Sequence, residues 1–180
     1  VNEAGDGDAA IQRYLRAGGL MVVMSTGPFP FYYNEDGDAV RSAGRMGLPM
    51  EGAGEWLQPG LADRETIGGW EGPPEGVTLR FDVDTEALPG LPETADFPAS
   101  GDVRWRPATV GMTAPGDEYQ ALATLRDEAG RSYGDGICLV RHVVSKPVGG
   151  TLIYVWMRMA DVLDRDELLA EVFRLAGETH

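Results

Sequence analysis

Cysteine, lysine and histidine are nearly absent from this 180-residue chain. Cys138 is the single cysteine, so no disulfide can form within the chain and a cysteine-rich zinc site is excluded. Lys146 is the single lysine, and all other basic side chains are arginines apart from two histidines. Long apolar runs are also missing, because none approaches the roughly 20 residues that cross a bilayer. The sequence therefore predicts no membrane insertion.

Positive charge is scarce relative to negative charge. The chain has 15 Lys and Arg against 29 Asp and Glu, a formal net charge of −14. Such a surface repels the phosphates of nucleic acids and anionic lipids, so neither is an expected partner. Hydrophobic residues make up 43%, which is typical of a globular protein, and the length fits one domain over residues 1–180.

The first pattern along the chain predicts a helix followed by a strand. Asp8 can cap a helix whose apolar residues, Tyr14 among them, recur at helical spacing. Gly18 and Gly19 suit a left-handed helix end. The continuous apolar run Leu20 to Ser25 is typical of a strand buried on both faces of a parallel sheet. Because this pattern is typical of the middle of an α/β unit, we expect the chain to be a piece of a longer protein.

Later segments predict mainly strands. A short helix is expected from Asp38 to Met46, and residues 51–76 are expected to have little regular structure. A connection from Leu88 to Pro98 is expected between strands. The predicted strands are Val77 to Asp82, Val103 to Arg106, Tyr119 to Arg126, Gly136 to Val144 and Thr151 to Met157. The last three are separated by short turns and must form an antiparallel meander.

The clearest element is the final helix. Asp164 is a good N-cap, with Glu167 at the third helical position. The helix is expected to end at Gly177. One apolar stripe is predicted from Leu168, Leu169, Val172, Phe173 and Ala176.

Two stretches resemble class I glutamine amidotransferase-like domains, including ThuA-like proteins and the trimerisation domain of some β-galactosidases. They are Ile11 to Val23, a helix, Gly-Gly and a buried strand, and Gly149 to Trp156 with the helix that follows. The resemblance implies an α/β fold: a flavodoxin-like three-layer sandwich whose mixed sheet has a C-terminal antiparallel meander and a closing helix. It also implies partners among other domains of the same chain or in a homo-oligomer, and it slightly favours a location outside the cytoplasm.

The catalytic residues of that family are not evident. The chain has no G-x-C-x-G nucleophile motif and no His-Pro-Glu-like pair. Cys138 and His142 lie on one predicted strand about 13 Å apart, whereas a nucleophile and its base need contact. Cys138 is therefore expected to be a buried apolar residue. Many relatives without the triad serve in binding or assembly, which is the function that we expect here, with no catalytic residue and no cofactor.

The best candidate binding residues follow the first strand. Ligands of open α/β sheets bind beyond the carboxyl ends of strands. Ser25, Thr26 and Gly27 occupy that position, and Phe29 and Tyr32 come next. Their aromatic rings can stack on a sugar or receive a partner's side chain, or they can simply fill the core.

An alternative is a glycan-active hydrolase. Trp56 and Trp70 stand among glutamates in residues 51–76, and a tryptophan beside two carboxylates is what glycoside chemistry uses. Under this hypothesis the ligand would be a carbohydrate. Another alternative is that the chain is the C-terminal part of an active amidotransferase-like enzyme. Asp36 and Asp38 lack the spacing of a calcium loop, so no metal ligand is predicted.

Overall fold

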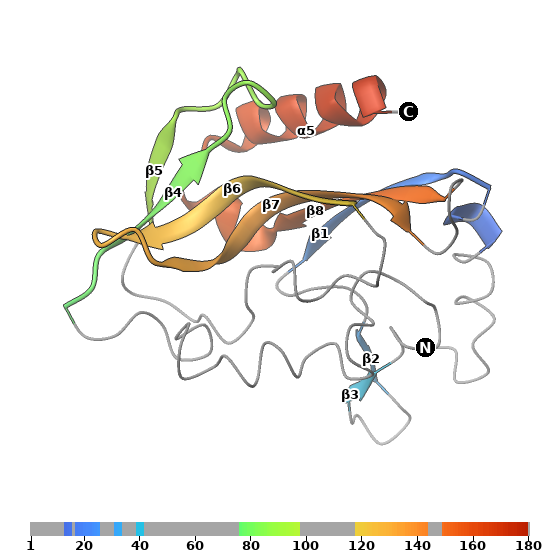
Figure 1. The fold of residues 1–180 in the computed structure, drawn as a ribbon, viewed down its shortest axis with the longest axis horizontal. Coiled ribbons are helices and arrows are strands. Elements are labelled where there is room, and N and C mark those ends of the chain that lie inside the picture. Colours follow the sequence, from blue (N-terminus) through green and yellow to red (C-terminus); the bar gives the residue numbers. More distant parts are fainter. Residues whose placement is uncertain are drawn as a thin grey trace.

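A six-stranded mixed sheet dominates the computed structural model, which describes residues 13–15, 17–25, 31–33, 39–41, 76–97, 118–143 and 149–179 (Figure 1). Its strand order is β1-β8-β7-β6-β4-β5. The bounds are β1 Leu20–Ser25, β4 Leu79–Val83, β5 Thr94–Phe97, β6 Glu118–Asp127, β7 Ser132–Val143 and β8 Gly150–Trp156. Two short strands, β2 Phe31–Tyr33 and β3 Ala39–Arg41, form a separate antiparallel pair.

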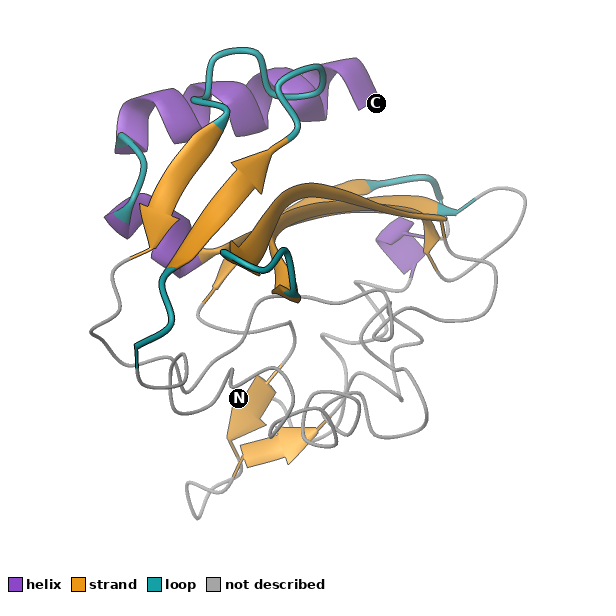
Figure 2. Ribbon diagram, turned by 60° about the vertical axis from the view of Figure 1, so that its left-hand side comes forward, coloured by secondary structure: helices purple, strands orange, loops and turns teal. Residues whose placement is uncertain are grey.

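Strands β6, β7 and β8 form the antiparallel meander that the sequence predicts. The β6–β7 turn is closed by a hydrogen bond from the Gly130 N–H to the Asp127 carbonyl (2.9 Å), and Gly130 has a positive φ of 80°. The register between β6 and β7 shifts repeatedly between Ala121 and Arg126. Such irregularities bend a strand and increase its twist. The sheet is accordingly curved like half of a barrel (Figure 2).

The corner before β1 has the geometry expected from its two glycines. The Gly19 N–H donates to the Tyr14 carbonyl and the Gly18 N–H to the Leu15 carbonyl, both at 2.9 Å, which is a Schellman helix end. Gly18 adopts a φ of 86°, where other residues are strained. A Cβ on Gly19 would overlap the ring of Tyr14. The chain can therefore pass directly into β1, which runs parallel to β8.

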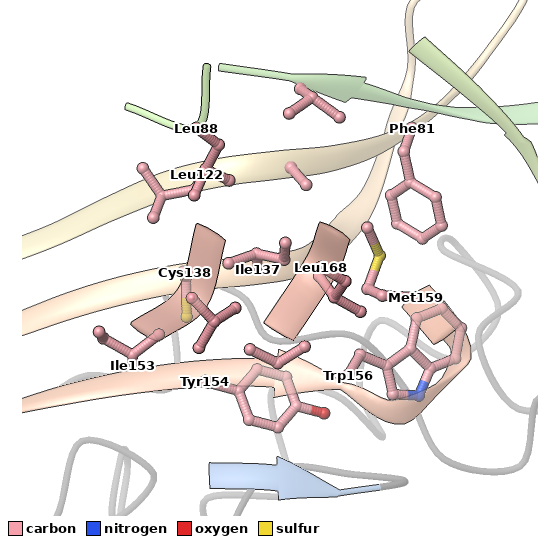
Figure 3. Packing of buried hydrophobic residues seen from close by; sticks show 14 of the residues in the cluster. Phe81, Leu88, Leu122, Ile137, Cys138, Ile153, Tyr154, Trp156, Met159 and Leu168 are labelled. Carbon is pink, nitrogen blue, oxygen red and sulfur yellow. The ribbon is translucent and has the colours of Figure 1, made fainter. Parts of the chain in front are cut away.

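The core continues from the sheet into an aromatic cluster at the end of β8 (Figure 3). Phe97 stacks on Trp156 with ring centroids 5.6 Å apart, and Phe81 meets both rings edge-on. Trp156 ends β8 and leads into the short 3-10 helix η3, Met157–Asp161. This cluster joins β4 and β5 to the meander.

Helix α5, Arg165–Thr179, lies over one face of the sheet (Figures 1 and 2). Asp164 caps it as predicted, since its Oδ1 accepts the N–H groups of Asp166 and Glu167 at 2.9 and 3.1 Å. The predicted apolar stripe is wrong in part. Leu168, Val172 and Leu175 are buried, whereas Leu169 is 36% exposed and Phe173 is 65% exposed. The predicted end at Gly177 is also wrong, because the helix continues to Thr179.

The predicted flavodoxin-like three-layer sandwich is wrong. The described residues are mostly sheet, with α5 and η3 as the helices among the named elements. The meander strands follow one another through short turns, and β6 and β7 are long, with 10 and 12 residues. A hairpin turn leaves no room for the crossover helices that cover the faces of a three-layer fold. The central sheet is mixed only because β1 pairs parallel with β8.

Other local predictions are corrected too. Residues 39–41, placed in a short helix from Asp38 to Met46, form strand β3. The predicted connection from Leu88 to Pro98 contains strand β5. The predicted strand Val103 to Arg106 lies outside the described residues.

Candidate functional site

Two of the candidate residues proposed from sequence, Ser25 and Tyr32, lie in described strands. Ser25 is the last residue of β1, in register with Trp156, and Tyr32 is the middle residue of β2. The remaining candidates lie outside the described residues: Thr26, Gly27, Phe29, Trp56 and Trp70. The ligand edge after β1 and the carbohydrate cleft therefore stay predictions.

Among the described strands, β1 is at the edge of the sheet, although its continuous apolar sequence predicts a strand buried on both faces. Its inner neighbour is β8, and none of the other described strands pairs with its outer side. The side chains of Leu20, Met21, Val22 and Val23 are half-buried, and that of Met24 is 37% exposed. An apolar strand without alternation predicts burial, but here that apolar surface is only partly covered.

The hydrogen bonds of Leu20 and Gly19 show which backbone groups of β1 face outward. The Thr151 N–H donates to the Gly19 carbonyl (2.9 Å), so Gly19 points toward β8. The Tyr14 hydroxyl donates to the Leu20 carbonyl (2.7 Å) and accepts from the Leu20 N–H (3.1 Å) on the other side. Because orientation alternates along a strand, Val22 and Met24 also direct their N–H and C=O groups outward.

Among the residues that the structure describes, one outward position of β1 thus has a hydrogen-bond partner and two have none. Tyr14 satisfies both backbone groups of Leu20. Within the described residues, no hydrogen bond reaches the outward groups of Val22 and Met24. An unpaired row of donors and acceptors is a template for another strand.

The two edges of the sheet differ in chemistry. From Ala17 to Ser25 the chain has no charged residue and no proline, which are the usual protections of an edge strand. The opposite edge, β5, has only four residues, and Thr94 and Asp96 are its exposed side chains. A short strand with an exposed charge is a poor template for pairing. The open edge of β1 is therefore the candidate functional site.

A buried polar cluster lies between β6 and β7, where their register shifts. Asp135 is only 7% exposed, and its carboxylate accepts hydrogen bonds from the hydroxyls of Tyr119 and Thr124, both at 2.6 Å. Buried carboxylates are costly unless they are hydrogen-bonded. The sequence pattern does not predict this cluster, because it places the start of the strand at Gly136. The one signal of the cluster is an aspartate between two glycines before an apolar run.

The raised pKa values of the groups in and beside this cluster favour a structural role over a catalytic one. Burial raises the pKa of Asp135, and the hydroxyls of Thr124 and Tyr119 and the charge of Arg126 partly oppose that rise. Burial, with the nearby Cys138 and Asp135, raises the pKa of Tyr119. Burial also raises the pKa of the Cys138 thiol to about 12. Cys138 is fully buried, as predicted, and its thiol is protonated at neutral pH, so it is a poor nucleophile.

The described segments meet the requirements of neither a metal site nor a membrane-spanning helix. None of their helices is long and apolar enough to span a bilayer. Within these segments, no three His, Cys, Asp or Glu side chains gather in a way that could hold a metal ion.

No protein-family model, no curated protein and no solved structure matches the chain.

Proposed function

We propose that this chain is a binding or assembly domain that takes an extended polypeptide segment onto the outer edge of β1. The observation that carries the proposal is the pair of outward N–H and C=O groups on Val22 and Met24, in a strand that has neither charge nor proline. Strand addition to an exposed edge is a common mode of peptide recognition, in which main-chain hydrogen bonds supply affinity.

The chemistry of β1 defines the segment that it would take. Four backbone groups can be satisfied, and each hydrogen bond contributes about 0.5 to 1.5 kcal/mol net. That alone does not offset the cost of association, so apolar side-chain contacts are also required. Half-buried Val22 and Val23 and exposed Met24 offer such contacts on both faces of the strand. The partner is accordingly an extended, apolar segment.

The proposal does not depend on the amidotransferase-like resemblance. That resemblance implies a helix-flanked sheet, and the described sheet is different. The glycan-active hydrolase rests on Trp56 and Trp70, which lie outside the described residues, and no described contact favours it. The open strand edge favours assembly over both enzymatic alternatives.

A strand-mimicking peptide tests the proposal. A fluorescent peptide of sequence LMVVMS with a polyethylene glycol tail should bind the protein, as measured by fluorescence anisotropy. Val22→Pro and Met24→Pro each remove one outward N–H group without removing a hydrogen bond to β8, because proline is tolerated where the missing N–H faces away from the neighbouring strand. Both variants should weaken peptide binding at least about tenfold, the equivalent of one 1.4 kcal/mol interaction.

Val22→Ala is the matched control, because it shortens the side chain but keeps the N–H group. It should bind the peptide more tightly than Val22→Pro. Circular dichroism should show that all the variants are folded. Equal binding by the wild type and both proline variants, or no binding by the wild type, would overturn the proposed function.

A further inference from the structure

We infer that the segment added to β1 is β1 of a second copy of this chain, paired antiparallel about a two-fold axis through Val23. This inference rests on the proposed function and names its partner. Its basis is the spacing of the open backbone groups, with Leu20 already occupied by Tyr14.

The open positions of β1 are complementary to themselves. In an antiparallel pair, two residues whose backbone groups face each other exchange both N–H to O=C bonds. If Val22 of one copy faces Met24 of the other, Met24 faces Val22 in turn, and all four open groups of each strand are satisfied. Val23 then faces its own symmetry mate in a non-hydrogen-bonded pair, with Cα atoms about 4.5 Å apart. A two-fold interface needs this kind of self-complementary surface.

Tyr14 limits this pairing to the C-terminal part of β1. The next outward position is Leu20, whose N–H and C=O are both bonded to the Tyr14 hydroxyl. A register centred closer to the start of β1 would have to displace that hydroxyl. The register centred on Val23 needs hydrogen bonds from Val22 and Met24 alone, and it keeps the Tyr14 contact when the strand of the second copy leaves the pair after Ser25, before it reaches Leu20.

Local charge permits the contact although the whole chain carries −14. Like charges directly opposite each other destabilise a strand pair. Residues Ala17 to Ser25 contain none, so the two-fold axis brings no ionised side chains of β1 together. The same strand would accept an unrelated apolar segment, and the experiment distinguishes that case.

Cysteine cross-linking tests the register. Val23→Cys places two thiols across the two-fold axis, at a separation that a disulfide can bridge. The oxidant diamide should convert most of this variant into a covalent dimer on non-reducing gels, as it takes up the two electrons and two protons of the thiol pair. Met21→Cys and Ser25→Cys should each form no covalent dimer alone but should cross-link when mixed, because Met21 faces Ser25 of the other copy in this register.

The wild type is the control, because its only thiol, Cys138, is fully buried and should not cross-link. Sedimentation equilibrium should show a reversible wild-type dimer that Val22→Pro and Met24→Pro weaken at least about tenfold. Cross-linking of Met21→Cys or Ser25→Cys alone, with none for Val23→Cys, would overturn the register.

A monomeric wild type without any Val23→Cys cross-link would overturn the second copy as partner. If the LMVVMS peptide still bound in that case, and the proline variants lost it, the proposed strand-addition function would stand with a different apolar partner. If peptide binding failed as well, both the inference and the proposed function would be wrong.

Discussion

At the scale of single residues, Asp135 is expected to make the stability of the fold depend on pH. Its carboxylate is buried and has two hydroxyl donors, from Tyr119 and Thr124, on the neighbouring strand. Burial nevertheless dominates and raises its pKa. A group whose pKa is higher in the folded state than in the unfolded state stabilises the fold when protonated. That contribution is present below the ordinary aspartate pKa of about 3.9 and is lost as pH rises through the folded value.

Asp135→Asn should expose this pH dependence. Asparagine resembles the protonated carboxyl group and does not ionise, so the wild type should lose stability relative to the variant as pH rises above about 4 and through the raised pKa of Asp135. The slope cannot exceed about 1.4 kcal/mol per pH unit for one proton. Urea unfolding of both proteins across this range measures the difference. A wild type that instead gains on the variant with rising pH would mean that the two hydroxyls hold the ionised form.

The thiol of Cys138 should be unreactive in the folded protein. It is fully buried, and its pKa is raised to about 12, so both access and thiolate are lacking at pH 8. Iodoacetamide should label it at least about a hundredfold more slowly than it labels the urea-unfolded chain, because native labelling must wait for opening. Mass spectrometry of the time course measures both rates. Comparable rates would show that this part of β7 opens readily.

At the scale of elements, α5 offers two adjacent leucines in different environments. Leu168 is buried in the core, and Leu169 is 36% exposed. Leu168→Ala should lower the free energy of unfolding by about 2 to 5 kcal/mol, as expected for a buried leucine. Leu169→Ala should cost clearly less, because part of its side chain is already in water. Chemical denaturation of both variants gives the comparison, and equal losses would mean that Leu169 is covered by a partner.

The N-cap of α5 is a second property of this element. Asp164→Ala removes the acceptor of two backbone N–H groups and should cost about 1 kcal/mol. Asp164→Ser keeps a capping oxygen and should recover most of that loss. Thermal unfolding of both variants tests the cap. If serine were no better than alanine, the negative charge of Asp164 would be the important property.

Local signals in the sequence predicted elements better than they predicted their assembly. The Gly18–Gly19 corner, the Asp164 cap and the meander depend on residues close in sequence, and all are present. The predicted three-layer arrangement is wrong because an apolar run identifies a strand without showing what covers it. The edge position of β1 depends on strand order. The Asp135 cluster depends on register shifts between β6 and β7. Composition predicts neither the order of the strands nor their register.

At the scale of the whole molecule, net charge opposes the dimer that the strand edge favours. Two copies at −14 repel each other through charges that lie outside the uncharged segment around β1. Local hydrogen bonds and apolar contacts are insensitive to salt by comparison. The balance between the two is therefore set by ionic strength.

Raising NaCl from about 0.05 M to about 0.5 M should tighten the dimer several-fold, because the screening length falls from more than 10 Å to less than 8 Å over this range. Sedimentation equilibrium at both concentrations measures the dissociation constant. Sodium sulfate should tighten it further through its general effect on apolar burial. Weaker association at higher salt would indicate an interface held by ion pairs, which the uncharged β1 edge does not provide.

The two unlike edges of the sheet also decide how large an assembly can become. Pairing through β1 uses that edge in both copies, and what remains outermost at each end is β5, four residues long with Asp96 exposed. Such ends do not recruit further strands, so growth would stop at two copies and fibrils would not follow. Had β5 also been a longer, uncharged apolar strand, both edges of the same sheet would have been open and the chain would have had a route to open-ended polymerisation.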